Sequence, residues 1–196
     1  MVVLFFLALI FYITFINSLL NDEGESRKHK RRIKLMANYN SFNKAKDKGK
    51  IGEETVKHLL ELNGFKVSDV STNSTYFHCG DLIAEKDNKS LFIEDKTDTV
   101  AGHTGNLVIE LITNKTLNKD GWFKVSTADK FAFYLEETNE VIFIDANELK
   151  ENYKQALNRI YTTTQYECGY IYKQGVIGLL SIAQLSNLSS FRRIAI

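Results

Sequence analysis

Two short strand-like runs that carry charged residues constrain the fold of this chain most strongly. The first run, Gly-Asp-Leu-Ile-Ala-Glu, contains Asp81, and the second ends in Glu94, Asp95 and Lys96. Successive side chains of a strand point to opposite faces of the sheet. Glu94 and Lys96 should therefore share one face, while Asp95 points to the other. If the two strands are neighbours, they offer two carboxylates and one ammonium at a single place.

This combination is suited to holding Mg²⁺ against a phosphodiester. Mg²⁺ binds proteins through one or two carboxylates and keeps several waters and substrate phosphate oxygens as its other ligands. A bound divalent metal lowers the pKa of its water and stabilises the charge of the transition state. The residues themselves thus indicate Asp81 and Glu94 as metal ligands, with Lys96 orienting the attacking water or neutralising phosphate charge.

The alternative is that these charges lie on an ordinary solvated face. The composition of the second run argues against it, because Phe92 and Ile93 make that strand apolar on both faces. Such a strand is typical of a central, buried position in a sheet. Charges at the end of a buried strand are costly unless they are paired or bound to metal.

A helix is predicted upstream, within residues 48–65. Its apolar residues recur at helical spacing and comprise Val56, Leu59, Leu60 and Leu62. Gly64 ends the pattern, since glycine adopts the left-handed conformation without steric cost. Glu53 falls at the edge of the apolar face and can reach the carboxylates of the strands, whereas Glu54 faces water. The other interpretation is that Glu53 is a first-turn glutamate favoured by the helix dipole.

The order of these elements resembles the PD-(D/E)xK nuclease superfamily, and most closely the archaeal-type Holliday junction resolvases and related phage and plasmid nucleases. The resemblance lies in Lys48-Gly49 before Glu53, the later Gly64-Phe65, and an Asp followed about a dozen residues later by Glu-x-Lys. It covers residues 46–97 well and extends more loosely to about residue 150. One departure is that Gly80 stands where the name-giving proline would be.

The resemblance implies a metal-dependent endonuclease that hydrolyses DNA phosphodiester bonds, with Mg²⁺ or Mn²⁺ as cofactor. It implies an α/β fold with a restriction-endonuclease-like αβββαβ core, a mixed central sheet flanked by helices, and often a homodimer. Asp81, Glu94 and the backbone carbonyl of Asp95 would bind metal. Glu53 would complete the site directly or through a metal-bound water, and Lys96 would position the attacking water or steady the transition state.

Two alternatives stay open. The first is a non-catalytic nucleic-acid-binding protein or membrane-tethered adaptor built on a nuclease fold. The second is a nuclease that acts on RNA.

The charge of the chain bears on how DNA would be held. The formal net charge of +1 says little by itself, but residues 37–196 hold 19 basic and 21 acidic residues, so the core is not globally basic and DNA would have to be held by local patches and metal-neutralised carboxylates. Lys48 and Lys50 lead into the predicted helix and form one candidate patch, although a solvated lysine-rich linker is the alternative. Lys130 is a further candidate phosphate contact. Two cysteines without Cys-x-x-Cys spacing favour a reducing compartment.

The N-terminus carries an apolar segment without charge over residues 1–20, which is long enough to span a bilayer. A basic run follows within the linker predicted over residues 21–45, and by the positive-inside rule it places the nuclease domain in the cytoplasm. If Met1 is the true start, the chain is a single-pass membrane-anchored protein. If translation starts at Met36, the domain is soluble.

The downstream pattern continues as α/β within a nuclease core over residues 46–160. A strand is predicted over residues 106–111, where Glu110 is either a further group supporting the metal or a charge at a strand edge. A helix is predicted to begin at Ser126 or Thr127, which are good N-cap residues. It should precede a hairpin of two buried strands, 131–135 and 141–145.

Asp145 is expected to cap another helix that runs to about Arg159. Residues 161–196 are interpreted as a C-terminal extension of the same domain, with one strand within 175–182.

Overall fold

The computed structural model describes residues 43–44, 46–76, 78–167 and 170–196. The chain divides into two compact units, Met1–Lys46 and Asp47–Ile196, and the following concerns the second. The apolar segment over residues 1–20 and nearly all of the 21–45 linker lie outside the described residues, so both stay predictions. Within the described ranges, no helix combines the length and the apolar character needed to cross a bilayer.

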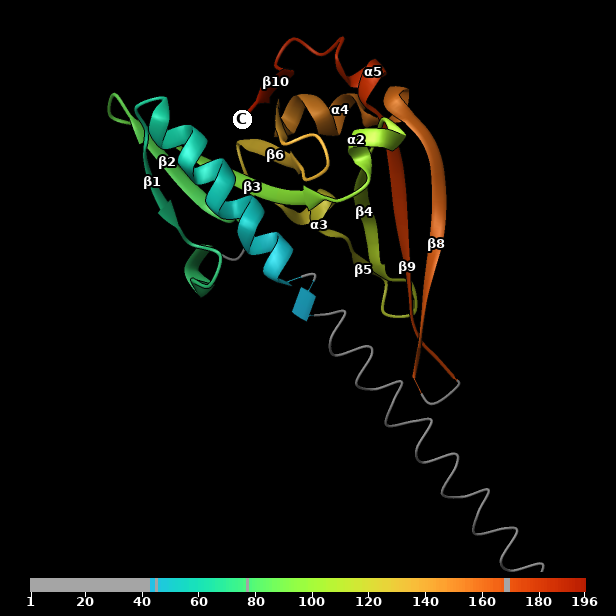
Figure 1. The fold of residues 1–196 in the computed structure, drawn as a ribbon. Coiled ribbons are helices and arrows are strands. Elements are labelled where there is room, and N and C mark those ends of the chain that lie inside the picture. Colours follow the sequence, from blue (N-terminus) through green and yellow to red (C-terminus); the bar gives the residue numbers. More distant parts are fainter. Residues whose placement is uncertain (1–42, 45, 77, 168–169) are drawn as a thin grey trace, which may run out of the picture. The chain divides into compact units, whose positions relative to one another are not determined.

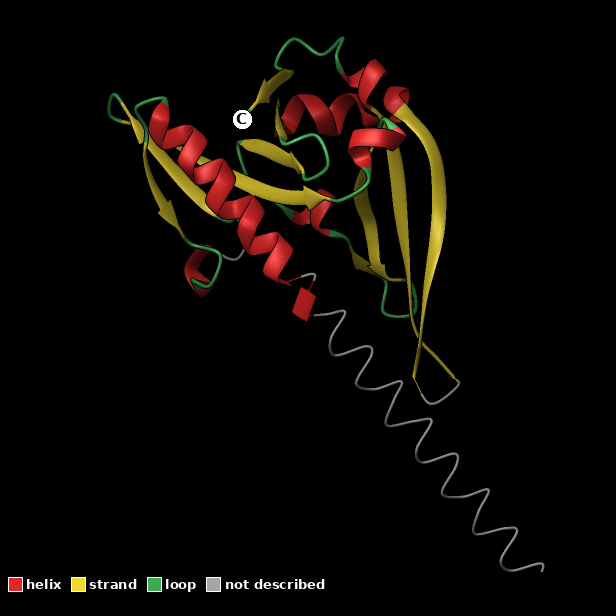
Figure 2. Ribbon diagram, in the orientation of Figure 1, coloured by secondary structure: helices red, strands yellow, loops and turns green. Residues whose placement is uncertain are grey.

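A six-stranded sheet forms the centre of the second unit (Figures 1 and 2). In spatial order its strands are β1 (Lys66–Asp69), β2 (Leu82–Lys86), β3 (Lys89–Asp98), β6 (Lys130–Leu135), β7 (Glu140–Asp145) and β10 (Arg192–Ala195). β3 and β6 are parallel, whereas the other neighbours are antiparallel. The prediction of an α/β chain with a mixed central sheet is therefore confirmed.

The β2–β3 hairpin sets the register on which the charged residues depend. Its two-residue turn consists of Asp87 and Asn88, both with positive φ, of 52° and 61°. Asp and Asn tolerate this conformation well, and it matches the twist of a tight hairpin. The turn pairs Leu82 with Ile93. One step further along, Asp81 comes to lie beside Glu94.

A helix over residues 47–62, coloured cyan in Figure 1, covers one face of this sheet. Val56 and Leu59 are buried against sheet residues that include Leu82 and Ile93. Burying each such side chain contributes roughly 1.5–3 kcal/mol. The predicted helix and its stop at Gly64, where φ is +82°, agree with the structure. Leu62 does not belong to the buried face as predicted, because it is 70 % exposed in the last turn.

A four-stranded antiparallel sheet packs against the other face of the six-stranded sheet. Its order is β5 (Lys119–Asp120), β4 (Asn106–Asn114), β9 (Tyr170–Ser181) and β8 (Leu157–Glu167). The strand predicted over 106–111 thus exists, but it belongs to this second sheet. The strand predicted within 175–182 is part of β9, whereas β8 was not predicted. Residues 158–163 of β8 are all exposed, so no apolar alternation marks that strand.

The larger hydrophobic core fills the space between the two sheets. Phe131, Phe133 and Leu135 of β6 meet Leu107 and Ile109 of β4 there, and all five are essentially inaccessible to solvent. The short helices α2 (Ala101–Thr104), α3 (Trp122–Val125) and α5 (Ile182–Leu185) and the longer α4 (Ala146–Ala156) border this core. A 3₁₀ turn, η1 (Ser74–Tyr76), precedes β2.

The helix predicted to start at Ser126 or Thr127 is wrong. The backbone at Ser126 is extended, with φ −60° and ψ 134°, and α3 ends just before it. Residues 127–129 instead run beside His78, which precedes β2, and beside Phe92 of β3. Thr127 N–H donates to the carbonyl of His78 at 2.6 Å, and Asp129 N–H donates to that of Phe92 at 2.9 Å. Bonds to neighbouring chain thus replace the intrahelical bonds that the capping pattern suggested.

The predicted hairpin of two buried strands is confirmed as β6 and β7. The helix after it is also confirmed, because the Asp145 side chain accepts hydrogen bonds from the N–H groups of Asn147 and Glu148 at 3.0 Å. That helix ends at Ala156 rather than near Arg159, since β8 begins at Leu157.

Candidate functional site

The ammonium of Lys96 lies among three oxygen atoms that come from three residues. Its Nζ atom is 2.8 Å from Oε1 of Glu94 and 3.2 Å from Oδ2 of Asp81. It also donates a hydrogen bond to the backbone carbonyl of Asp95, at 2.7 Å. The structure therefore gathers around one cation the three oxygens that the sequence suggested as metal ligands.

Asp81 is held in place by the backbone of β3. Its N–H donates to the carbonyl of Ile93 at 2.8 Å, and its Oδ2 accepts from the N–H of Asp95 at 2.9 Å. Gly80, just before it, has φ +131°, and a Cβ there would lie 2.6 Å from the Ile93 carbonyl oxygen. Proline, whose φ is fixed near −65°, cannot adopt this backbone. The close approach of the two strands explains the glycine at this position.

Glu94 is fixed by a hydroxyl from the segment that follows α3. Ser126 Oγ donates to Oε2 of Glu94 at 3.0 Å, and Ser126 is only 2 % exposed. The two oxygens of this carboxylate thus have different partners, because Oε1 faces Lys96.

The electrostatics keep Lys96 charged. Burial lowers the pKa of its ammonium, but the neighbouring Glu94 and Asp81 carboxylates raise it by more, so the pKa lies above the ordinary value. A group with these surroundings is a fixed positive charge rather than a proton donor near neutral pH.

Glu53 lies on the helix side of the sheet and is half-buried. Burial raises the pKa of its carboxyl group, and the negative charges of Asp81 and Asp69 raise it further. Lys96 acts in the opposite direction. Glu53 is therefore within electrostatic range of the site, yet among the described contacts no hydrogen bond or ion pair joins it to Asp81, Glu94 or Lys96.

Asp95 points to the face opposite Glu94 and Lys96, as the alternation predicts. It is 5 % exposed, and its Oδ1 atom has no hydrogen-bond partner among the described residues. Burial raises the pKa of this carboxyl group well above its ordinary value, and the carboxylates of Asp81, Glu53 and Glu94 add to the shift against the opposing effect of Lys96. A Cβ at Gly52 of the helix would lie 2.0 Å from Thr97 Oγ1 and 3.1 Å from Oδ2 of Asp95, so glycine at this position lets the helix pass closely over β3.

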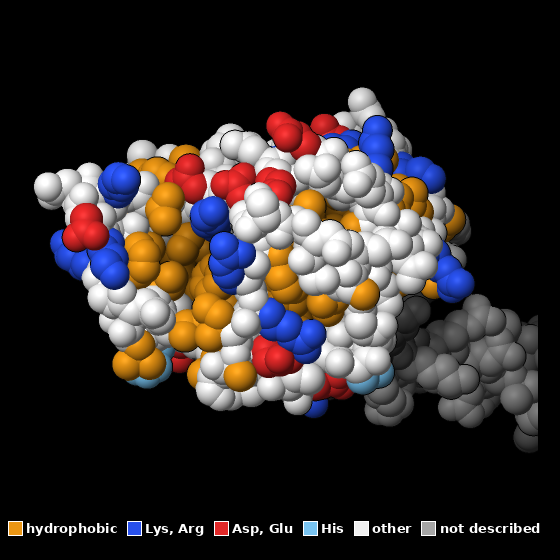
Figure 3. Space-filling view, turned by 90° about the horizontal axis from the view of Figure 1, so that it is seen from above, with side chains coloured by type: hydrophobic (Ala, Val, Ile, Leu, Met, Phe, Trp, Pro, Cys, Tyr) orange, Lys and Arg blue, Asp and Glu red, His pale blue; other side chains and the backbone are white. Residues whose placement is uncertain are grey.

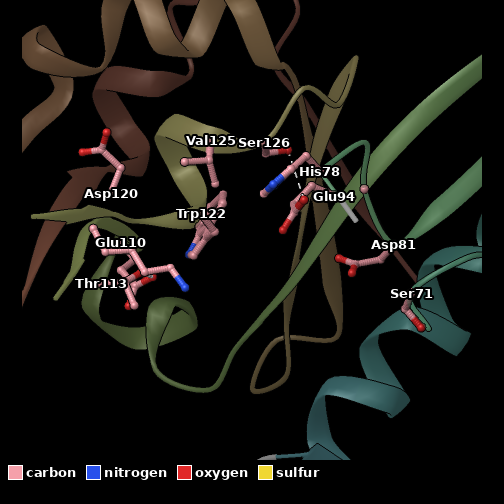
Figure 4. A pocket seen from close by; sticks show the side chains of 12 residues that line it. Ser71, His78, Asp81, Glu94, Glu110, Thr113, Asp120, Trp122, Val125 and Ser126 are labelled. Carbon is pink, nitrogen blue, oxygen red and sulfur yellow. Dashed lines mark hydrogen bonds between the residues drawn. The ribbon is translucent and has the colours of Figure 1, made fainter. Parts of the chain in front are cut away.

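A cavity of about 360 Å³ opens beside the charged group, between the two sheets. Asp81 and Glu94 line it on one side and Glu110 and Thr113 on the other, with the indole of Trp122 between them (Figure 4). The cavity leaves room next to the carboxylates for part of a substrate.

Glu110 does not join the carboxylates of the first sheet. Its Oε2 accepts a hydrogen bond from Thr113 Oγ1 at 2.6 Å, within the second sheet. It faces the same cavity from the opposite wall, and among the described contacts none joins it to Asp81 or Glu94, so its role in supporting a metal stays a prediction.

The lysines proposed as nucleic-acid contacts are engaged in ion pairs. Lys48 is 2.6 Å from Glu136, Lys50 is 3.9 Å from Glu54, and Lys130 is 3.4 Å from Asp145. On the face shown in Figure 3, basic and acidic side chains are interspersed, without a broad basic surface. Any contact of these lysines with nucleic acid would have to exchange an existing partner, and it stays a prediction.

The donor set at Lys96 suits a hard divalent cation. It consists only of oxygens, two from carboxylates and one from a backbone carbonyl, and a positive charge already lies among them. Within the described ranges, no three or more His, Cys, Asp or Glu side chains group closely enough to hold a metal by themselves. A metal here would therefore need the carbonyl, water or substrate oxygens as its further ligands.

Two residues of this site were not predicted as functional. Trp122 lines the cavity and lies with its ring 5.3 Å from Lys96 Nζ, while Ser126 was interpreted only as a helix cap. No local sequence pattern marks either residue as functional, because both lie about thirty residues after Glu94 and Lys96 in the chain. The one hint is that Trp122 is the sole tryptophan of the chain.

Comparisons with known proteins add little. No protein-family model matches the chain, and no curated protein matches its sequence. Among solved structures, a bacterial homing endonuclease resembles it with a TM-score of 0.41 and 19 % identity, over 52 % of this chain and 69 % of the other. A likeness of this size assigns neither a family nor an activity to this chain.

Proposed function

We propose that this chain is a divalent-metal-dependent endonuclease of the PD-(D/E)xK type that hydrolyses phosphodiester bonds in DNA. The observation that carries the proposal is the convergence of Asp81 Oδ2, Glu94 Oε1 and the Asp95 carbonyl on one cationic group. The spacing of the motif favours a Holliday junction resolvase-like enzyme within that class.

The elements around the site support the proposal. A helix bearing Glu53 is followed by three antiparallel strands, and β6 then joins β3 in parallel. In this arrangement Asp81, Glu94 and the Asp95 carbonyl would hold Mg²⁺ or Mn²⁺. The metal would activate a water and stabilise charge on the phosphate. Glu53 would act on the site through its negative charge or through an intervening water.

Lys96 is the residue of the chain that would act on the reacting phosphate. Its pKa is raised by Glu94 and Asp81 against the effect of burial, so it carries a full positive charge at neutral pH. Its side chain is 32 % exposed, and its ammonium pairs with Asp81 and Glu94, which line the cavity. A fixed positive charge at this place stabilises charge that develops on phosphate oxygens.

The alternative is a non-catalytic nucleic-acid-binding protein on the same fold. The observation that favours it is that the Lys96 ammonium forms ion pairs with both Asp81 and Glu94. The two proposals differ in one property, since only the enzyme needs Asp81 and Glu94 to exchange the ammonium for a divalent cation.

Cleavage of plasmid DNA and of a synthetic four-way junction in Mg²⁺ tests the proposal. The Asp81→Asn variant should lower the cleavage rate by about 10³-fold, because losing a metal ligand costs several kcal/mol of transition-state stabilisation. Glu85→Gln is the matched control, since Glu85 is an exposed acid on β2, the strand that follows Asp81, and pairs with Lys66 at 3.6 Å. Chelation of the metal should stop cleavage by the unmodified chain.

Retained cleavage in the Asp81→Asn variant would refute the enzyme. Binding of DNA without cleavage in Mg²⁺ or Mn²⁺ would support the non-catalytic alternative. Preferential cleavage of RNA over DNA in a competition assay would correct the substrate class. Junction resolution also requires two sites related by symmetry, so light scattering should show a dimer if the four-way junction is the substrate.

A further inference from the structure

One short segment, residues 121–126, contacts both charged groups of the candidate site. It begins at Gly121, includes α3, and ends at Ser126. Trp122 at its start lies beside Lys96, and Ser126 at its end donates to Glu94. Through these two contacts, the segment reaches both residues of the Glu-x-Lys pair, Glu94 and Lys96.

The position of Trp122 follows from the register of β3 and β6. Glu94 pairs with Phe131 and Lys96 pairs with Phe133 in parallel, so these four side chains share one face of the sheet. The Trp122 ring packs on both phenylalanines, with centroids 5.5 Å and 6.4 Å apart. The Trp122 ring therefore lies beside the Lys96 ammonium, with 5.3 Å between the ring centroid and Nζ. A cation at this distance from an indole is attracted by the ring.

The position of Ser126 is fixed from two sides. Its hydroxyl donates to Glu94 Oε2 and accepts from the N–H of Ala128 at 3.3 Å. Its carbonyl accepts a hydrogen bond from Lys150 of α4. Because Ser126 is almost completely buried, water cannot easily replace the hydroxyl at Oε2.

The second sheet anchors the start of the segment. Gly121 N–H donates to the carbonyl of Leu111 at 3.1 Å. A Cβ at Gly121 would lie 2.1 Å from the carbonyl oxygen of Glu110, so only glycine permits this approach to β4. The segment thus connects the second sheet to the charged residues of the first.

We propose that Trp122 and Ser126 are positioning residues of the candidate nuclease site, an inference that rests on the proposed function. Ser126 holds one oxygen of Glu94 and thereby leaves Oε1 to face the cation. Trp122 holds the Lys96 ammonium beside the carboxylates. If Asp81 and Glu94 held a divalent cation, Lys96 would lose carboxylate partners, and the indole ring of Trp122 would keep its positive charge beside them.

The test compares paired variants of the full chain in Mg²⁺-dependent DNA cleavage. Ser126→Ala should raise the Mg²⁺ concentration at half-maximal rate by about 10-fold, the usual effect of removing a group that orients a metal ligand, and Ser126→Thr should recover most of it. Trp122→Leu should lower kcat by about 10-fold at unchanged KM for DNA, and Trp122→Phe should recover most of it. Lys124→Gln, an exposed neighbour paired with Asp120, is the control.

A second readout does not depend on cleavage. Because Trp122 is the sole tryptophan, its emission reports on the site, and Mg²⁺ alone should change it. The change should be absent in Asp81→Asn and should need about 10-fold more Mg²⁺ in Ser126→Ala. Urea unfolding of each variant checks that the fold is intact.

The outcomes separate the two proposals. If Asp81→Asn cleaves normally, the proposed function fails. If Asp81→Asn is inactive but Ser126→Ala and Trp122→Leu behave as Lys124→Gln does in rate, metal dependence and emission, the function stands and the positioning roles are refuted. The positioning roles would also be refuted if Ser126→Thr lost as much as Ser126→Ala, or Trp122→Phe as much as Trp122→Leu. Equal losses would mean that neither the hydroxyl nor the aromatic ring is what the site requires.

Discussion

Neighbouring charged residues of β3 lie on opposite faces of the strand and in different surroundings. On the face toward the second sheet, Glu94 lines a cavity and pairs with Lys96. On the face toward the helix, Asp95 is buried beneath Gly52 with one oxygen unpartnered. The peptide carbonyl of Asp95 nevertheless belongs to the first face, where it accepts from Lys96.

The acidic character of a residue therefore does not decide its role at this site. Access to the cavity and the presence of a counter-charge do. Burial raises the pKa of the Asp95 carboxyl group well above its ordinary value against the opposing effect of Lys96, whereas Glu94 forms an ion pair with the Lys96 ammonium at 2.8 Å. We therefore expect only one of the two adjacent carboxyl side chains, that of Glu94, to contribute to function.

The largest expected effect distinguishes these faces by activity. Lys96→Met should lower DNA cleavage by about 10²–10³-fold, since it removes a preorganised positive charge from the site. Asp95→Asn should change the rate by less than about threefold, because the backbone carbonyl is retained. Single-turnover cleavage in saturating Mg²⁺ measures both. Similar losses in the two variants would mean that both faces of the strand contribute to the reaction.

The next effect concerns how closely the helix packs on the buried face. A Cβ at Gly52 would lie 2.0 Å from Thr97 Oγ1, so Gly52→Ala should destabilise the fold by about 1–2 kcal/mol despite the better helix propensity of alanine. Gly49→Ala, in the same helix with nothing within 4 Å, should instead stabilise it by about 0.5–1 kcal/mol. Urea unfolding compares the pair. Equal effects would contradict the close packing at Gly52.

The smallest effect is a pH dependence of stability that originates at Asp95. Because burial raises its pKa in the folded chain, folding favours the protonated form. Stability from this group is complete below the ordinary aspartate pKa, about 3.9, and is lost as pH rises through the raised value. Asp95→Asn cannot ionise, so it should be more stable by about 1 kcal/mol at pH 7, with the difference shrinking toward pH 4. A difference that grows on acidification would reverse the assignment.

The helix over residues 47–62 and the β6–β7 hairpin could be predicted because their signals lie within a few consecutive residues. Val56 and Leu59 mark one face of a helix by spacing alone, and the alternation along residues 94–96 separates Asp95 from its neighbours. Other features lacked such signals. Residues 158–163 of β8 are exposed on both faces and show no alternation, and Ser126 satisfies a capping pattern while its hydroxyl donates to Glu94 instead.

Which residues of β3 share a face follows from the local sequence, because side-chain alternation and a two-residue turn are properties of a few consecutive residues. That Trp122 and Ser126 from a later segment lie beside Lys96 and Glu94, and that Gly52 of the helix packs on Asp95, becomes evident only in the folded chain. Such contacts arise from packing between layers. They depend on the register of the parallel strands β3 and β6 and on the close approach allowed at Gly52 and Gly121, which no local pattern encodes.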